Sequence, residues 1–329
     1  MQKSSFTFPL NESQQAALAK LLSEGNYRPK EVPYARAAAE GPDCNIVLYE
    51  SGKCVVQGKG AQDWVTFTLE PEILQEAKLG YERIVNPEAF AAHMGVDESG
   101  KGDFFGPLVI AAAYVNPGLV HEFRKLDVRD SKTISSDRKA EEMADAIADL
   151  LGDRFTVIAI GPAAYNRMYA KIRNVNRMLA WGHARAIENL LEKVPDCPRA
   201  LSDQFGPKQQ IERALMAKGR KIQLDQRTKA ESDPAVAAAS ILARATFVRA
   251  LRELQKRHGV AIPKGVSQKV KDSAIDLVRK KGPMALIETA KCHFKTTDEV
   301  LLAAGSSRAA LGELGQAVSK SMAPKKEEA

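Results

Sequence analysis

Two adjacent carboxylates, Asp97 and Glu98, stand between apolar runs of strand type at residues 94–96 and 108–115. Side chains of a strand point to alternate faces, so both carboxylates can serve one site only if the strand ends at Asp97 and the chain then turns. The Ser-Gly-Lys-Gly sequence at residues 99–102 permits such a turn. Carboxylates beside glycines and a lysine suit a hard divalent cation and a phosphate, because Mg²⁺ is commonly shared between protein carboxylates and substrate phosphate.

This stretch has two other interpretations, a plain β-hairpin and a nucleotide phosphate loop. A β-hairpin with a solvated polar turn and no chemistry would give the same pattern, and the residues alone leave it open. Gly95 to Lys101 also satisfies the Gly-x-x-x-x-Gly-Lys part of a nucleotide phosphate loop. That interpretation fails because Gly102 stands where Ser or Thr is required. The residues after Gly102 are also typical of a strand, where a helix should begin.

Further acids stand where predicted elements begin or end. Asp203 follows a short predicted strand at residues 198–202, and the glycine and proline that come next prevent the strand from continuing. Glu231 and Asp233 precede a predicted helix that begins near Pro234 and runs to about residue 258. Asp233, directly before this proline, suits the helix N-cap. It is also the alternative to Glu231 as a site carboxylate.

The block at residues 97–108, Asp-Glu-Ser-Gly-Lys-Gly-Asp-Phe-Phe-Gly-Pro-Leu, resembles the first active-site block of bacterial ribonuclease HIII, a type 2 ribonuclease H. Lys101 and the Asp-Phe-Phe at residues 103–105 favour this family over ribonuclease HII, which usually has arginine between the glycines and lacks the Asp-Phe-Phe. The stretches 169–183, 229–244 and 290–297 are similar as well. The resemblance covers most of residues 34–300 and implies cleavage of the RNA strand of RNA/DNA hybrids.

The resemblance also implies a set of site residues. Four acids from three blocks would be catalytic and metal-binding: Asp97, Glu98, Asp203 and Glu231. Glu231 is favoured over Asp233, because Lys-Ala-Glu-Ser matches the HIII pattern. The implied substrate-binding residues are Ser99, Gly100, Lys101, Gly102 and, from the Asp-Ser-Lys loop, Lys132. The glycine backbone would approach the RNA 2′-hydroxyls, and Lys101 would act as a point charge toward phosphate.

Four grouped carboxylates repel one another and raise their own pKa values, so such a cluster calls for cations. Two Mg²⁺ or Mn²⁺ ions would resolve this conflict and support an in-line displacement at phosphorus. The resemblance implies products with 5′-phosphate and 3′-hydroxyl ends. It also implies that Asp97 is the carboxylate that bridges the two ions.

Two competing functions remain open from the sequence. A ribonuclease HII-like enzyme would use the same acids but would excise single embedded ribonucleotides at an RNA-to-DNA junction. A non-catalytic hybrid-binding protein would keep a basic surface and lose an acid, whereas all four candidate acids are present here.

The order of predicted elements indicates two domains. A helix at 11–25, strands at 34–38, 44–49 and 53–57, and a helix at 61–70 make a small α+β module. The family resemblance implies a TATA-binding-protein-like, substrate-binding fold for this module. We assign it residues 1–75 and place a linker at 76–92.

Residues 93–305 are predicted to form an α/β ribonuclease H-like catalytic domain, with a mixed central sheet flanked by helices. Beyond the strands and acids above, we expect a helix at 137–151, an apolar strand at 155–160, a helix ending near residue 193 and another at 272–281. Residues 306–329 turn to Ala, Ser and Lys, and we predict a disordered tail with a weak helix at most near Leu311.

Composition and charge are consistent with a nucleic-acid enzyme. Of 329 residues 44% are hydrophobic and 27% are charged, and the net charge is +7. Residues 91–305 carry 35 Lys and Arg against 26 Asp and Glu, whereas residues 1–90 carry 9 against 12. A basic surface around an acidic centre suits a polyanion that is bound broadly and cut locally.

No apolar run of 18 or more residues and no signal-type segment occurs, so we expect a cytoplasmic protein with no membrane partner. The four cysteines are far apart, which argues against a zinc site. We expect the enzyme to be a monomer.

Overall fold

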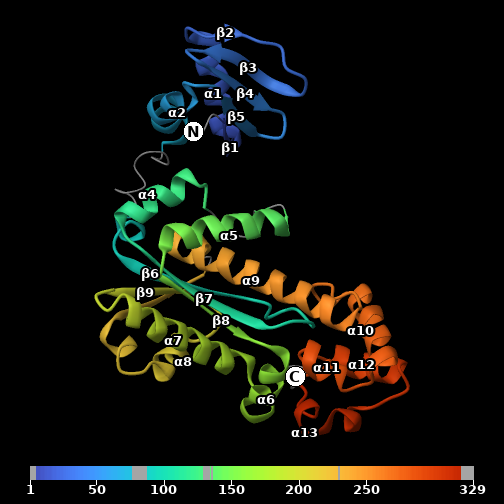
Figure 1. The fold of residues 1–329 in the computed structure, drawn as a ribbon. Helices are drawn as coiled ribbons and strands as arrows, with labels where there is room; N and C mark the ends of the chain where they lie inside the picture. The colour runs from blue at the N-terminus through green and yellow to red at the C-terminus, as the bar shows by residue number, and fades with distance from the viewer. Residues whose placement is uncertain (1–4, 76–86, 129–133, 135, 229, 320–329) are drawn as a thin grey trace, which may run out of the picture. The chain divides into compact units, whose positions relative to one another are not determined.

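The computed structural model describes residues 5–75, 87–128, 134, 136–228 and 230–319. The chain divides into two compact units, Met1–Phe90 and Ala91–Ala329, and each has its own five-stranded sheet (Figure 1). The division falls inside the predicted linker, of which residues 76–86 lie outside the described part of the chain.

The first unit is an antiparallel sheet packed against helices. The strand order is β1-β5-β4-β3-β2, and the bounds are β1 Ser5–Pro9, β2 Arg28–Pro29, β3 Ala35–Gly41, β4 Cys44–Tyr49 and β5 Lys53–Gln57. The helix α1 (Glu12–Glu24) has Asn11 as its N-cap, whose side chain accepts from the Gln14 N–H at 2.9 Å. The strands β1 and β2 were not predicted, because neither is a long apolar run.

The predicted helix at 61–70 is longer in the structure. It is α-helical in α2 (Ala61–Trp64) and continues with π-type turns through Val65–Leu74, passing Pro71. Alternate residues of β4, with side chains such as Ile46 and Leu48, are buried beneath these helices, as a period of two predicts.

The sheet of the second unit is mixed, in the order β10-β9-β6-β7-β8. The bounds are β6 His93–Ser99, β7 Leu108–Val115, β8 Phe155–Ile160, β9 Arg199–Asp203 and β10 Gln223–Arg227. The strands β6, β9 and β10 are parallel, while β7 is antiparallel to both β6 and β8. The strand β7 is buried along its whole length, whereas β8 lies at the edge and is mostly half-buried.

Two long helices, α9 (Pro234–His258) and α7 (Val175–Lys193), cover opposite faces of this sheet (Figure 1). The alanine-rich start of α9 packs closely on β6, since a Cβ atom at Gly95 would lie 2.1 Å from the Val236 nitrogen. By length and composition α9 would also suit a membrane span, but 72% of its most apolar window is buried inside the fold, as expected of a core helix.

The remaining helices surround this core. They are α4 Pro117–Lys125, α5 Asp137–Leu151, α6 Pro162–Ile172, α8 Lys208–Ala214, α10 Gln268–Lys281, α11 Ala285–Thr289, α12 Thr296–Ala303 and α13 Gly312–Gly315. The predicted helices at 137–151 and 272–281 are present, and the second begins four residues earlier than predicted.

The prediction of a disordered tail from residue 306 is wrong for residues 306–319. Arg308 donates to the carbonyl oxygens of Cys292 at 2.8 Å and Phe294 at 3.2 Å, and it pairs with Asp298. Leu311 is buried. The Arg308 side chain therefore holds this segment against the fold. The Ala- and Ser-rich composition of the segment did not predict these contacts. Residues 320–329 lie outside the described range.

Candidate functional site

The predicted carboxylates line one pocket of the second unit. Its volume is about 440 Å³, and its lining residues are Asp97, Glu98, Ser99, Gly100, Lys101, Gly102, Asp203, Ser240, Arg244 and Lys264. Three of the four predicted acids and all four residues of the predicted glycine-lysine turn therefore meet here. Glu231 is not among the lining residues, and Lys132 lies outside the described residues.

The expectation that the strand ends at Asp97 is wrong. The strand β6 continues to Ser99, which pairs with Val109 of β7. On its other edge, β6 pairs with β9 only as far as Val96 opposite Ser202, so beyond that point this edge is open. Both carboxylates can reach the open edge from opposite faces of the sheet, which sequence alternation alone did not suggest.

Asp97 faces α9. Its side chain has a hydrogen bond with Ser240, and one of its oxygens accepts the Glu98 backbone N–H at 2.8 Å. Burial and the adjacent negative charge of Glu98 raise the pKa of Asp97 to about 7, although these hydrogen bonds and His183 oppose the shift. A carboxylate with this pKa lacks a neutralising partner in the protein, which is a property of a ligand for an added cation.

Glu98 faces α7, where it contacts the buried His183. The Nε2 atom of His183 lies 3.1 Å from Oε2 of Glu98, and its Nδ1 atom lies 3.0 Å from Oγ of Ser202 on β9. Lys101 Nζ lies 3.6 Å from the other carboxylate oxygen. Burial raises the pKa of Glu98, but the hydrogen bonds and charges of His183 and Lys101 outweigh it and hold the pKa below its ordinary value. The two neighbouring carboxylates are therefore shifted in opposite directions, the pKa of Glu98 downward and that of Asp97 upward.

The glycines of the turn have different roles. Gly100 has a φ of +86°, and a Cβ atom there would lie 2.3 Å from the Pro107 carbonyl oxygen, so the fold itself requires this glycine. At Gly102 a Cβ atom would meet no atom within 4 Å. The space beside Gly102 is therefore open, and its predicted close approach to the substrate stays a prediction.

A buried lysine holds the segment that follows the turn. Lys291 Nζ donates to the carbonyl oxygens of Asp103 at 2.8 Å and Phe105 at 3.1 Å. Burial lowers the pKa of Lys291 to about 7, against the charge of Asp103. The Asp103 side chain in turn accepts the N–H of Gly265, so the turn and the segment that carries Lys264 are joined.

Asp203 and the turn at Ala230–Ser232 are linked directly. Oδ1 of Asp203 accepts the backbone N–H of Ala230 at 3.0 Å, so Glu231 lies in the 3₁₀ turn next to Asp203. Asp233 has another role. It is 1% exposed, caps α9 by accepting the Ala235 N–H at 2.9 Å, and lies 2.9 Å from Nε2 of His93.

The position of His93 separates Asp233 from the pocket. His93 begins β6 and Asp97 comes four residues later, a rise of roughly 13 Å along a strand. The predicted N-cap role of Asp233 is thus confirmed, and its side chain is directed away from the carboxylate pocket.

The pocket provides the ligand atoms that a hard divalent cation takes. Its carboxylates are oxygen donors, and neither cysteine nor histidine lines it. Within the described residues, no group of three or more His, Cys, Asp or Glu side chains could hold a metal ion by itself. Mg²⁺ commonly binds through one or two carboxylates together with substrate phosphate, so a partly open carboxylate wall fits such an ion.

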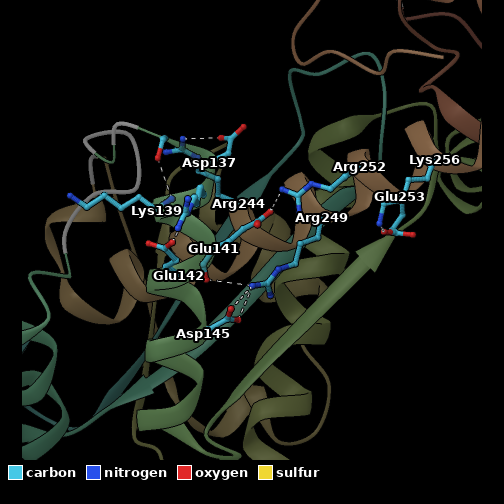
Figure 2. Close-up of polar contacts among 12 residues, drawn as sticks. Asp137, Lys139, Glu141, Glu142, Asp145, Arg244, Arg249, Arg252, Glu253 and Lys256 are labelled. Carbon is cyan, nitrogen blue, oxygen red and sulfur yellow. Dashed lines mark hydrogen bonds and ion pairs between the residues drawn. The ribbon is translucent and has the colours of Figure 1, made fainter. Parts of the chain in front are cut away.

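Two basic residues of the pocket were not predicted. Arg244 on α9 contacts Asp137 at 3.1 Å, and Lys264 contacts the same carboxylate at 2.8 Å and 2.7 Å. Figure 2 shows this cluster where α5 and α9 are joined by ion pairs. Arg244 stands four residues after Ser240, which is the helical spacing that could have indicated it. No local signal marks Lys264, because only the tertiary fold brings it to the pocket.

Arg244 and Lys264 bring positive charge to the pocket that holds the carboxylates. Hydrogen bonds from Lys264 and Arg244 outweigh burial and lower the pKa of Asp137. Both basic side chains line the pocket, so their charges can act on an anion bound there. The pocket therefore combines carboxylates that would hold divalent cations with basic side chains that would bind a phosphodiester.

Comparison with known proteins identifies close relatives. The Ribonuclease HII family model matches residues 94–297, and a domain of unknown function (DUF3378) matches residues 7–78. Ribonuclease HIII of Protochlamydia amoebophila is 40% identical over 284 residues, which is 86% of this chain and 92% of that protein. Ribonuclease HIII of Chlamydia trachomatis serovar L2 is 39% identical over 300 residues, covering 91% and 98%.

Solved structures agree with these relatives. Bst-RNase HIII in complex with Mn²⁺ aligns with a TM-score of 0.65 and 28% identity, over 92% of this chain and 99% of that chain. Aquifex aeolicus RNase H3 aligns with a TM-score of 0.50 and 26% identity, over 87% and 98%.

Proposed function

The chain belongs to the ribonuclease HIII family, and we propose that Asp97, Glu98, Asp203 and Glu231 are the carboxylates with which it binds two divalent cations. It is a ribonuclease that hydrolyses the RNA strand of RNA/DNA hybrids with the help of divalent metal ions. The observation that carries the site assignment is the meeting of Asp97, Glu98 and Asp203 in one pocket with residues 99–102.

The carboxylates have separable roles in this proposal. Asp97 would be shared by the cations, as the family resemblance implies, and its burial beside Glu98 leaves a negative charge that an added cation would neutralise. Glu98 and Asp203 are held in place by His183 and by the Ala230 N–H, respectively. Glu231 would complete the set of carboxylates from the turn beside Asp203.

The remaining pocket residues position the substrate. When bound, the cations activate water and stabilise the leaving 3′ oxygen, which gives 5′-phosphate and 3′-hydroxyl products. The open backbone at Gly102 approaches the 2′-hydroxyl, which distinguishes RNA from DNA. Lys101, Arg244 and Lys264 hold the phosphates beside the cut.

A direct assay tests this function. The purified protein is incubated with a uniform RNA/DNA hybrid and with a DNA duplex that contains one ribonucleotide, each with Mg²⁺, with Mn²⁺ and with chelator. We expect multiple cuts in the uniform hybrid and none without metal. Cutting confined to the single ribonucleotide would favour the ribonuclease HII-like junction activity. Binding without any cutting would show that the chain is a non-catalytic hybrid-binding protein.

A further inference from the structure

The strand β8, the helix α6 and the part of α7 before Glu188 form a stretch without acidic residues. Residues 154–187 contain no Asp or Glu. Their Lys and Arg residues are Arg154, Arg167, Lys171, Arg173, Arg177 and Arg185. The chain turns between the two helices at Arg173, which has a left-handed φ of +51°, and at Asn174, whose side chain caps α7.

Most of these cations lack a carboxylate partner. Within the described ranges, no Asp or Glu oxygen lies within 4.0 Å of the charged nitrogens of Arg167, Lys171, Arg173, Arg177 and Arg185. Other surface cations of the same unit are paired, such as Lys256 with Glu253 and Lys280 with Asp276, both at 2.9 Å. A cluster of unpaired cations repels itself in the free protein, and a bound polyanion relieves that repulsion.

Three residues of α7 form a stripe on its outer side. Arg177, Trp181 and Arg185 are spaced four residues apart, so their side chains neighbour one another along the helix. Trp181 is 38% exposed, and the Arg185 guanidinium lies 5.9 Å from the centre of its ring. The rest of α7, including His183, is largely buried. Arg173 stands directly before the N-cap Asn174, four residues before Arg177 in the sequence.

The segment that follows the pocket residue Asp203 links the carboxylate pocket to α7. The segment after Asp203 rests on the first half of α7, where the Phe205 ring lies 4.7 Å from the ring of His183. A Cβ atom at Gly206 would lie 3.7 Å from the Asn176 side chain. The helix α7 is on the opposite face of the sheet from α9, which carries Arg244 (Figure 1). A polynucleotide bound in the pocket therefore has a basic surface available on the α7 side as well.

We propose that Arg173, Arg177, Trp181 and Arg185 form a second nucleic-acid contact, here named the α7 surface, that binds the sugar-phosphate backbone of the duplex flanking the cut. The proposal rests on the proposed hybrid-cleaving function. Guanidinium groups bind phosphate through paired, charge-assisted hydrogen bonds. The exposed indole adds an apolar contact to a sugar or base and restricts the neighbouring Arg185.

The test compares two triple variants of equal charge. Arg173→Gln/Arg177→Gln/Arg185→Gln removes the α7 surface, and Lys125→Gln/Lys256→Gln/Lys280→Gln removes three cations that are paired with a neighbour on their own helix. Equilibrium binding to an RNA/DNA hybrid is measured in chelator, so that no cutting occurs, over a series of salt concentrations.

For the α7 variant we expect the slope of log K against log salt to become shallower by about 2 to 3, since each phosphate contact contributes about 0.9 on B-DNA. We expect its KM for cleavage to rise about tenfold while kcat stays within about twofold, because a remote contact contributes uniform binding. The control variant should change the slope by less than about 1. Thermal melting checks that both triple variants fold. If the α7 triple variant does not fold, the single variant Arg177→Gln is used in its place.

The tryptophan supplies an independent readout. In a Trp64→Phe background Trp181 is the single tryptophan, and hybrid binding should protect its fluorescence from iodide. Equal slopes and equal KM values in the two triple variants would overturn the α7 surface, as would unprotected Trp181. Wild-type cleavage in the same assay separates this failure from failure of the proposed function, because the enzyme would still cut the hybrid.

Discussion

The ring of His183 joins Glu98 to Ser202, with contacts of 3.1 Å on one side and 3.0 Å on the other. The two partners belong to different parallel strands, β6 and β9, at the point where their pairing stops. His183 is fully buried, so it cannot itself bind substrate. It is a positioning residue that fixes the orientation of Glu98 and favours its charged form.

Replacing His183 should therefore weaken metal use more than folding. In His183→Ala we expect the half-saturating Mn²⁺ concentration to rise about 10- to 100-fold, the usual cost of losing a partner of a metal ligand. His183→Gln, which can still donate to Glu98, should recover part of the loss. The measurement is a Mn²⁺ titration of cleavage, with melting temperature as the control. Unchanged metal dependence in His183→Ala would reduce the residue to a structural role.

Asp97→Asn should abolish cleavage while hybrid binding survives. The amide keeps the shape of the side chain but loses the charge that binds a cation, whereas the basic residues of the pocket and of α7 are untouched. We expect turnover to fall by about 10²-fold or more, the scale of a lost electrostatic contact to the transition state. Cleavage rate and hybrid affinity are measured on the same preparation. Activity within tenfold of wild type would remove Asp97 from the site.

The raised pKa of Asp97, about 7, predicts a pH-dependent metal requirement. Below this pH a proton occupies the carboxylate that the cation needs, and above it the carboxylate is free, so metal affinity should fall as the pH falls. The half-saturating Mg²⁺ concentration should rise about tenfold for each pH unit below 7, because one proton competes with the cation. Titrations from pH 5.5 to 8 measure this dependence. Saturating metal should suppress it, and a constant half-saturating concentration would contradict the prediction.

Much of this site could be predicted because its chemistry is local in sequence. The glycines at 100 and 102 and the carboxylates at 97 and 98 are neighbours, and the helix from Pro234 follows from its proline, its N-cap and its alanines. The predicted family resemblance is confirmed by the relatives, and the mixed sheet with flanking helices is confirmed as well.

The remaining site residues depend on tertiary contacts that no local pattern contains. His183 stands 85 residues from Glu98, and Lys264 reaches the pocket through a bond between Asp103 and Gly265, 162 residues apart. The strand end was misjudged for the same reason. The alternation of side chains between two faces is a property of a single strand. The access of Asp97 and Glu98 to a common pocket depends instead on where the neighbouring strand β9 stops pairing with β6.

The first unit should contribute affinity rather than chemistry. A chain that begins at Phe90 keeps the whole second compact unit, so we expect it to fold and to cut hybrid at saturating concentration. Its KM should rise with kcat little changed, because a remote binding surface contributes mainly uniform binding. Steady-state kinetics of the two chains make the comparison. A collapse of kcat at unchanged KM would show that the first unit is part of the catalytic machinery.

The last prediction separates Glu231 from Asp233. Glu231→Gln should raise the metal requirement and lower turnover by about 10²-fold or more, because a charged ligand is lost. Asp233→Asn should retain activity and stability, since asparagine caps a helix about as well as aspartate and can still bond to His93. Asp233→Ala should cost about 1 kcal/mol for the lost cap, and a further 1 to 3 kcal/mol, roughly, for the buried His93 left unpaired. Melting temperature and cleavage are measured for all three variants. An inactive Asp233→Asn with an intact melting temperature, beside an active Glu231→Gln, would make Asp233 the fourth ligand.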